Sequence, residues 1–136
     1  MINYWLVKSE PFKYSWEQFA KDKTTVWDGV RNYQARNNLQ GMKKGDLVLF
    51  YHSNEGMHVV GIAKVSKEFF QDPSTDDPRW VSVELKAYKA LKNPVTLSTI
   101  KSDKQLENIS LVKQGRLSVM GLKAEEFDRI IELGSK

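Results

Sequence analysis

Residues 80–91 alternate between apolar and polar side chains with a period of two. Apolar residues occupy the odd positions from Val81 to Ala87, whereas Ser82, Glu84 and Lys86 occupy the even positions. Successive side chains of a β-strand point to opposite faces, so this pattern predicts a long antiparallel strand with one buried face. A strand of this length requires neighbouring strands that pair with it along the chain.

Shorter apolar runs supply those neighbours. Residues 4–8, 47–51 and 59–65 are rich in β-branched or aromatic residues and are bounded by turn residues, so each predicts a strand. The turn at 54–56 predicts a hairpin between the second and third of these strands. Val26 and Trp27 predict a short extended piece, and residues 116–119 predict a further short strand. Residues 71–78 form a polar loop with two prolines and three aspartates.

Helical signals fall between and after the strands. Ser15 with Gln18, and Ser102 with Gln105, have the spacing of a capping box, and Asn32 can cap a helix that ends near Leu39. We expect two short helical turns in residues 94–109 and a helix over residues 123–133. The sequence therefore predicts an α+β fold, with an antiparallel sheet that curls toward a barrel and short flanking helices. At 136 residues we expect one domain, residues 1–136.

The bulk composition limits the location and the partners. No apolar run approaches the ~20 residues of a membrane helix, and the first residues lack the features of a signal peptide. The chain has no cysteine, which excludes disulfides and thiolate chemistry, so we expect a soluble cytoplasmic protein without membrane contact. A net charge of +4 permits a polyanionic partner without requiring one.

Catalytic chemistry has little support in the sequence. The only two histidines are His52 and His58, and no carboxylate near them has a spacing that completes a metal site. His52 and Ser53 are adjacent on a predicted strand, so their side chains point to opposite faces. We find no nucleophile elbow and no glycine-rich phosphate loop. We therefore expect a non-enzymatic protein with neither a metal nor another cofactor.

Residues 27–38 combine a tryptophan, a glycine, a tyrosine, two arginines and several amide side chains. Aromatic rings stack on flat ligands, amides pair with base edges, and guanidinium groups bind phosphate. Trp27 is either a core residue or a stacking surface, and Trp80 is either core or rim, whereas Trp5 and Trp16 are expected in the core. Arg31 is the better phosphate or base contact, whereas Arg36 fits an internal salt bridge equally well.

The chain resembles the EVE domain family along nearly its whole length. The motifs that carry the resemblance are residues 4–11 (YWLVKSEP), 27–36 (WDGVRNYQAR), 45–53 (GDLVLFYHS), 60–63 (VGIA) and 116–119 (RLSV). The resemblance implies a PUA-like fold, a small curled sheet or pseudo-barrel. It also implies a non-catalytic module that binds DNA or RNA and holds a modified base, with a modified cytosine in DNA favoured. The alternatives are an RNA-binding accessory domain and, with less support, a small nucleotide-directed enzyme.

The resemblance also implies which residues line the base pocket. They are Ser9, Glu10, Trp27, Gly29, Arg31, Asn32, Tyr33, Gln34, His52 and Ser53, with Arg116 and Ser118 approaching from the C-terminal side. In this scheme Trp27 stacks on the base, with Tyr33 or Trp80 as further stacking candidates. Polar side chains such as Ser9 and Asn32 contact the base edge. Lys8, Arg31 and Arg116 hold phosphate.

Overall fold

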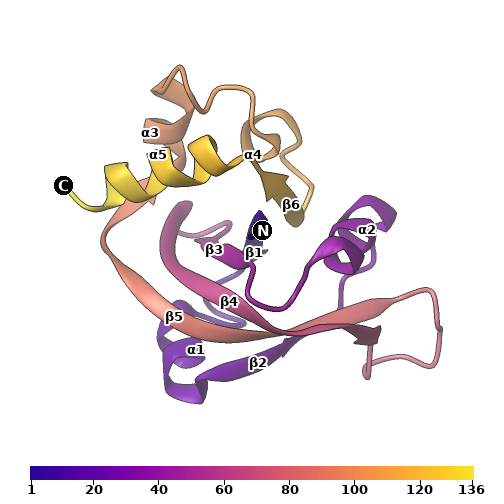
Figure 1. Ribbon diagram of the computed structural model, residues 1–136. Helices are drawn as coiled ribbons and strands as arrows, with labels where there is room; N and C mark the ends of the chain where they lie inside the picture. Colours follow the sequence, from indigo (N-terminus) through magenta and orange to yellow (C-terminus); the bar gives the residue numbers. More distant parts are fainter.

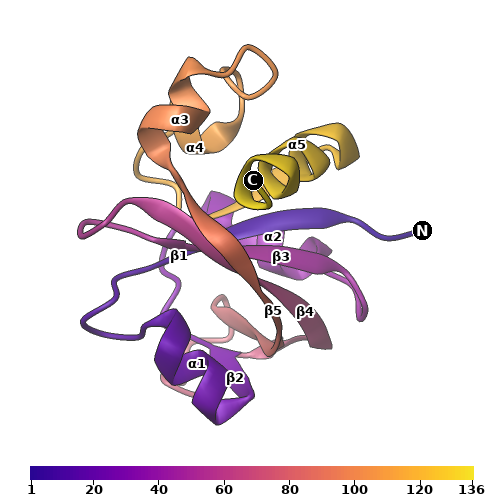
Figure 2. The ribbon, with the colours of Figure 1, turned by 90° about the vertical axis from the view of Figure 1, so that its left-hand side faces the viewer.

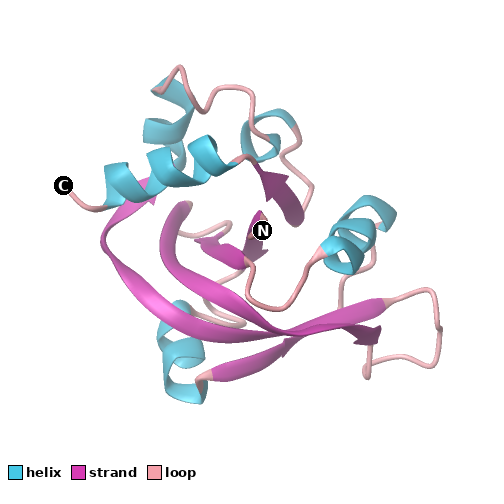
Figure 3. Cartoon of the chain, in the orientation of Figure 1, coloured by secondary structure: helices cyan, strands magenta, loops and turns pink.

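The computed structural model describes residues 1–136, which form six strands and five helices (Figures 1 and 3). The strands are β1 (Tyr4–Ser9), β2 (Thr24–Trp27), β3 (Leu47–His52), β4 (His58–Gln71), β5 (Val81–Thr96) and β6 (Val119–Leu122). The helices are α1 (Trp16–Asp22), α2 (Tyr33–Gly41), α3 (Leu97–Ser102), α4 (Ser110–Lys113) and α5 (Ala124–Gly134). The expected α+β class is confirmed.

The six strands form one sheet in the order β2-β5-β4-β3-β1-β6. Neighbouring strands are antiparallel except β1 and β3, which run parallel. The expected antiparallel pairing is therefore wrong for this one pair of strands. Parallel neighbours need a long crossover, and the segment with α1, β2 and α2 provides it. Within this crossover Trp27 ends β2 in the sheet, and the loop and helix α2 that follow it lie outside the sheet.

The sheet curls because its two longest strands bend. The pairing of β4 with β5 shifts register four times, and such irregularities bend a strand and increase its twist. Figures 1 and 2 show β4 and β5 sweeping around the molecule, with α3, α4 and α5 gathered on one side and α1 on the opposite side. The edge strands β2 and β6 do not pair with each other, so the barrel stays open.

Phe50 of β3 lies at the centre of an aromatic core. Its ring is 5.5 Å from those of Trp16 and Phe19 and 5.7 Å from that of Trp27, measured between centroids. A Cβ at Gly61 would lie 2.6 Å from the Trp16 indole, so the glycine makes room for this tryptophan. Trp5 also packs against the core and donates its indole N–H to buried Asp46 at 3.0 Å. The core positions expected for Trp5 and Trp16 are confirmed.

The helix caps agree with the expectations only in part. Asn32 caps α2 by accepting from the Ala35 N–H at 2.9 Å, and Ser15 caps α1 by accepting from the Gln18 N–H at 3.1 Å. The capping box expected at Ser102 is wrong, because Ser102 is the last residue of α3, which Thr96 caps. Strand β5 also continues to Thr96, so the first helical turn begins at residue 97 and not at 94.

Two further boundaries differ from the expectations. The strand expected at residues 116–119 is β6, which begins at Val119. The alternating strand begins at Val81, one residue after Trp80. None of the helices combines the length and the apolar character needed to cross a bilayer.

Candidate functional site

A cleft of about 520 Å³ opens where three separate segments meet. They are the end of β1 with the turn after it, the end of β2 with the loop that leads to α2, and the residue just before β6. The volume falls within the range of small-ligand pockets, which is ~300–1,000 Å³. The lining residues are Lys8, Ser9, Glu10, Lys13, Tyr14, Thr25, Val26, Trp27, Asp28, Gly29, Val30, Arg31 and Ser118.

Half of the predicted site residues line this cleft, although the chain separates them by up to about a hundred positions. They are Lys8, Ser9, Glu10, Trp27, Gly29, Arg31 and Ser118. The pairing of β1 with β6 brings Ser118 beside the first strand, and the Lys8 N–H donates to the Ser118 carbonyl at 2.9 Å. The sheet topology therefore joins the N-terminal and C-terminal parts of the predicted site.

Trp27 is both a core residue and a cleft residue. Its ring meets Phe50 edge-on at an interplanar angle of 82°, and it packs against the hydrophobic core. The residue is only partly buried, and it lines the cleft. Trp27 therefore packs against the core and also contributes to the lining of the cleft, so the core position does not exclude contact with a ligand.

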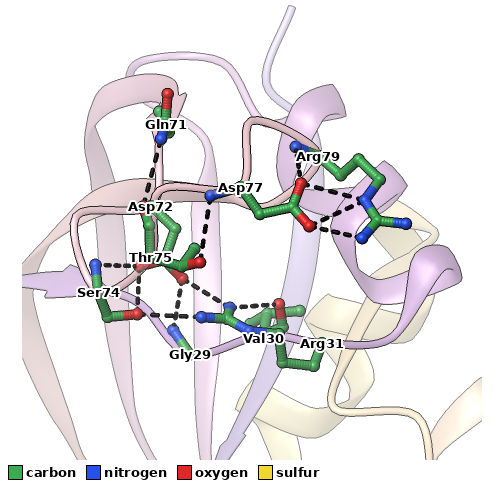
Figure 4. Close-up of polar contacts among 9 residues, drawn as sticks. All are labelled: Gly29, Val30, Arg31, Gln71, Asp72, Ser74, Thr75, Asp77 and Arg79. Atoms are coloured by element: carbon green, nitrogen blue, oxygen red, sulfur yellow. Dashed lines mark hydrogen bonds and ion pairs between the residues drawn. The ribbon is translucent and has the colours of Figure 1, made fainter.

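Asp72 fixes the loop that carries Gly29 and Arg31 (Figure 4). Its side chain is fully buried, and its Oδ2 accepts from the Gly29 N–H at 2.8 Å and from Arg31 Nη1 at 2.9 Å. Its Oδ1 accepts from the N–H and the hydroxyl of Ser74, at 2.7 and 2.6 Å. One carboxylate thereby ties the β4–β5 loop to the wall of the cleft.

The protonation of Asp72 reflects these bonds. Burial alone raises the pKa of a carboxyl group, but hydrogen bonds from Ser74, Arg31 and Gly29 outweigh it and lower the pKa of Asp72 to about 2. Asp72 is therefore ionised at neutral pH. Arg31 makes an ion pair with it. The internal salt bridge suggested for Arg36 is not found, since Arg36 donates to the Asn37 side chain and the Arg79 carbonyl. Arg31 also donates to Ser74 Oγ and to the Val30 carbonyl, which leaves part of its guanidinium free.

Gly29 is needed for its backbone conformation. Its φ is +77°, a region that residues with a Cβ adopt at a cost, and nothing lies within 4 Å of the position where a Cβ would stand. The Gly29 N–H donates to Asp72, and the positive φ sets the direction in which the chain continues toward Arg31. Gly29 is also one of the residues that line the cleft.

The wall that follows β1 is a hydrogen-bonded turn. The Glu10 carbonyl accepts from the N–H groups of Lys13 and Tyr14, and Ser9 Oγ donates to the Tyr14 carbonyl at 2.6 Å. Lys8 reaches across to the Gly115 carbonyl at 2.8 Å, and burial lowers the pKa of its ammonium group. Burial has the opposite effect on the phenol of Tyr14, whose pKa it raises, because in both groups burial disfavours the charged form. These contacts hold polar and cationic groups at fixed places along one side of the cleft.

The other half of the predicted set lies outside the cleft lining. These residues are Asn32, Tyr33, Gln34, His52, Ser53, Trp80 and Arg116. Asn32 is occupied as the cap of α2, and the backbone N–H of Ser53 donates to the Ser9 carbonyl at 2.9 Å. Gln34 and Arg116 are exposed. The resemblance placed these residues in the pocket, except Trp80, which was a further stacking candidate, but none of them belongs to the lining of the cleft.

His52 has a structural role at the start of α1. Its Nε2 accepts from the Trp16 N–H at 3.0 Å, so the ring is neutral, and it supplies an acceptor for an amide in the first turn of the helix. Burial lowers the pKa of His52, and the neighbouring His58 lowers it further, against the opposing charge of Glu17. No three His, Asp or Glu side chains converge in a way that could hold a metal ion.

Tyr33, which is exposed, and Trp80, which is half-buried, instead form a cluster beside the cleft loop. Their ring centroids are 5.0 Å apart, and Arg36 lies 5.1 Å from the Tyr33 ring. Arg31 and Arg79 lie 5.6 and 6.0 Å from the Trp80 ring. We call these five residues the arginine–aromatic cluster. Arg31 belongs to both the cluster and the cleft, so the two surfaces are continuous.

Six lining residues and the carboxylate that organises them were not among the predicted site residues. Thr25 lies two positions before Trp27, so the period of a strand could have placed both on one face. Lys13, Tyr14, Val26, Asp28 and Val30 also line the cleft. Asp72 lies in a loop with two other aspartates, and nothing local distinguishes the one that becomes buried.

The chain is similar to known proteins of one family. The EVE domain family profile matches residues 3–133. Thymocyte nuclear protein 1 of mouse is 38% identical over 167 aligned residues, which cover 98% of this chain and 74% of the mouse protein. The human protein of the same name is 36% identical over 170 residues, covering 100% of this chain and 76% of the human protein.

Solved structures share the same fold. A protein from Agrobacterium tumefaciens has a TM-score of 0.94 and 47% identity, covering 97% of this chain and 92% of the other. The human THYN1 protein, in complex with 5-methylcytosine containing DNA, has a TM-score of 0.91 and 36% identity, covering 98% of both chains.

A more distant neighbour shares the fold alone. The YTH domain of Zygosaccharomyces rouxii MRB1, in complex with N6-methyladenosine RNA, has a TM-score of 0.62 and 16% identity, covering 98% of this chain and 87% of the other. Together with the closer structures it confirms the expected PUA-like arrangement of the sheet.

Proposed function

This chain belongs to the EVE domain family, as its motifs predicted, and we propose that it reads a modified base in DNA, with 5-methylcytosine as the first candidate. The observation that carries the proposal is the position of Trp27, a partly exposed aromatic residue in the lining of a cleft of about 520 Å³. The human THYN1 protein, 36% identical, forms a complex with 5-methylcytosine containing DNA, which supports the choice of ligand.

In the proposed complex a base leaves the stack and enters the cleft beside Trp27. Extruding a base costs a few kcal/mol, and stacking on an aromatic ring contributes roughly 1–3 kcal/mol. The carboxylates of Glu10 and Asp28 supply acceptors for the polar edge of the base, as does Ser9 Oγ, whose hydroxyl already donates to the Tyr14 carbonyl. The hydroxyl of Ser118, which lies beside the end of β1, supplies a donor. The anchored indole favours this role because a ring held by Phe50 loses little freedom when a base stacks on it.

The DNA backbone is held by cations around the cleft. Lys8 and Lys13 line it, Arg31 keeps donors free beside its bond to Asp72, and Arg116 is exposed near the C-terminal wall. The arginine–aromatic cluster extends this basic rim. Its rings at Tyr33 and Trp80 offer a stacking surface for a flanking nucleotide outside the pocket, and Gln34 contacts the same strand.

We propose that the protein acts by binding alone. His52, the best candidate for acid–base chemistry in the sequence, lies outside the cleft lining, and its Nε2 already accepts from the Trp16 N–H. Recognition then depends on shape and on polar groups that a wrong base would leave unpaired in the cleft. The cytoplasmic location expected from the sequence stays a prediction.

The test is a titration with oligonucleotides that differ in one methyl group. Tryptophan fluorescence is followed while 5-methylcytosine and plain cytosine are compared in otherwise identical DNA duplexes, DNA single strands and RNA single strands. We expect tighter binding to methylated DNA, and an affinity that falls as salt concentration rises because phosphate contacts release counterions. Equal affinity for methylated and plain DNA would refute the proposal, and a preference for RNA would favour the RNA-binding alternative.

A further inference from the structure

Phe12 is the most exposed large apolar side chain of the fold, apart from the N-terminal Met1. Its relative exposure is 71%, compared with 54% for Tyr88 and 46% for Phe69. An apolar ring in water is unfavourable by roughly 25 cal/mol for each Å² that burial would cover. A lone exposed apolar residue is common on protein surfaces, so its position must decide whether it has a function.

Phe12 lies in the turn that forms one wall of the cleft. Glu10 and Lys13 both line the cleft, and Phe12 lies between them at the tip of their turn. Consecutive Cα atoms are ~3.8 Å apart, so the Phe12 backbone is next to the wall of the cleft. The ring nevertheless contributes nothing to the lining. It therefore lies beside the cleft and contacts solvent.

The turn holds Phe12 in a defined place. The N–H groups of Lys13 and Tyr14 donate to the Glu10 carbonyl at 3.0 and 2.9 Å, and Pro11 restricts the backbone before the phenylalanine. Lys13 pairs with Glu10 at 3.1 Å, and its ammonium group lies 5.9 Å from the Phe12 ring. The ammonium group of Lys13 can pair with a phosphate, and the exposed ring of Phe12 beside it can stack on an exposed base.

We propose that Phe12 is a wedge that enters the DNA duplex and fills the space left when the modified base moves into the cleft. This inference rests on the proposed function. Apolar wedges such as Phe are inserted between base steps by proteins that distort DNA, where they offset part of the lost stacking. In this arrangement Trp27 stacks on the extruded base inside the cleft, and Phe12 stacks on the bases left behind. Lys13 neutralises a phosphate beside the opening.

The other exposed rings do not share this combination of features. Tyr88 lies on β5, where the centre of its ring is 4.1 Å from the ammonium group of Lys64. Tyr33 packs against Trp80. Phe69 is exposed on β4, and neither it nor its sequence neighbours line the cleft. Phe69 is therefore a suitable control, since it is also an exposed phenylalanine but lies outside the turn.

The experiment compares Phe12→Ala with Phe69→Ala on two forms of the same methylated sequence. A duplex must lose a base from its stack, whereas a single strand offers the base without leaving a gap between paired bases. For Phe12→Ala we expect an affinity loss of about fivefold or more on the duplex, from lost stacking of ~1 kcal/mol or more, and less than about twofold on the single strand. Phe69→Ala should leave both affinities unchanged.

Each outcome separates the wedge from the proposed function. An unchanged duplex affinity of Phe12→Ala, or an equal loss on duplex and single strand, would overturn the wedge while leaving the proposed function intact. Failure of the unaltered protein to prefer methylated DNA of either form would instead overturn the proposed function. Urea unfolding of Phe12→Ala is expected to match the unaltered protein because the ring is exposed. A Phe12→Leu variant should recover part of the duplex affinity because it restores apolar bulk.

Discussion

The buried carboxylate of Asp72 holds the guanidinium of Arg31 at 2.9 Å and joins two segments 41 residues apart. The same carboxylate accepts from the Gly29 N–H, so the geometry of the cleft wall depends on a residue that does not line the cleft. This relationship separates two roles within the site. Arg31 and Gly29 line the cleft, and Asp72 positions them.

Replacing Asp72 with alanine should therefore destabilise the protein. The change leaves the Gly29 N–H and the Arg31 guanidinium without their acceptor, and loss of one partner from a buried ion pair costs several kcal/mol. Because Arg31 is 41% exposed and can turn to water, we expect about 2 kcal/mol, measured as the free energy of unfolding in urea. Asp76→Ala is the matched control, since Asp76 is exposed in the same loop. Equal stability of the two variants would contradict this role.

The same carboxylate should make stability fall at low pH. The pKa of Asp72 is about 2 in the folded protein, against an ordinary value of 3.8. Because the folded pKa is the lower one, this stabilisation is fully present above about pH 4 and is lost as pH falls toward 2. The loss is about 2 kcal/mol for this group, by the linkage between pKa and stability. Urea unfolding between pH 5 and pH 2 should show a shallower decline in Asp72→Asn than in the unaltered protein.

Gly29 allows a test of backbone conformation separately from space. A Cβ at Gly29 or at Gly115 would meet nothing within 4 Å, but only Gly29 has a positive φ. Gly29→Ala should therefore lose about 1–2 kcal/mol of unfolding free energy, the cost of a left-handed conformation for a residue with a Cβ. Gly115→Ala should be neutral or slightly stabilising, because alanine restricts the unfolded chain. Thermal or urea unfolding of both variants decides the matter, and equal effects would argue against strain at residue 29.

His52 should add a second pH dependence, at a higher pH. Its folded pKa is lowered by burial and by His58, so the unfolded chain takes up the proton first. Stability should then decrease as pH falls below about 6.5, the ordinary value for histidine, and protonation also removes the acceptor for the Trp16 N–H. Urea unfolding at pH 7 and pH 5 should show a smaller difference for His52→Gln than for the unaltered protein. The difference should persist in His58→Gln, and its complete loss there would contradict the assignment to His52.

The sequence predicted best those features that depend on neighbouring residues. The alternation at 80–91 predicted β5, and Asn32 predicted the start of α2, because strand period and helix capping are local effects. The parallel pairing of β1 with β3 was missed, since it depends on a crossover of three elements that no local pattern describes. The length of β5 past Leu91 was missed for a related reason, because its pairing with β4 overrides the turn signal of Pro94.

The candidate site shows the same division. Trp27, Gly29 and Arg31 were identified because an aromatic ring, a glycine and a guanidinium lie together in one short segment. His52 was assigned to the pocket by family resemblance, yet its imidazole faces the start of α1. Asp72 could not be identified, because its importance comes from burial against a loop 41 residues away and not from its neighbours.

Trp27 allows binding to be separated from core packing. Leucine at this position keeps an apolar contact with Phe50 but removes the flat ring from the cleft. We expect Trp27→Leu to weaken binding of methylated DNA by about tenfold or more, since base stacking contributes ~1–3 kcal/mol, and to lower the unfolding free energy by about 1–2 kcal/mol. Fluorescence anisotropy of a labelled duplex gives the affinity, and urea unfolding gives the stability.

Trp16→Leu is the matched control for this change. Trp16 meets the same Phe50 ring edge-on at 5.5 Å but does not line the cleft. Its replacement should cost at least as much stability as Trp27→Leu, because Trp16 also packs tightly against Gly61, while the affinity for methylated DNA stays within about twofold of the unaltered value. If both variants lost affinity in proportion to their lost stability, Trp27 would act only through the core. An affinity loss confined to Trp27→Leu would assign the indole to the ligand, since the two tryptophans share a core partner and differ in their access to the cleft.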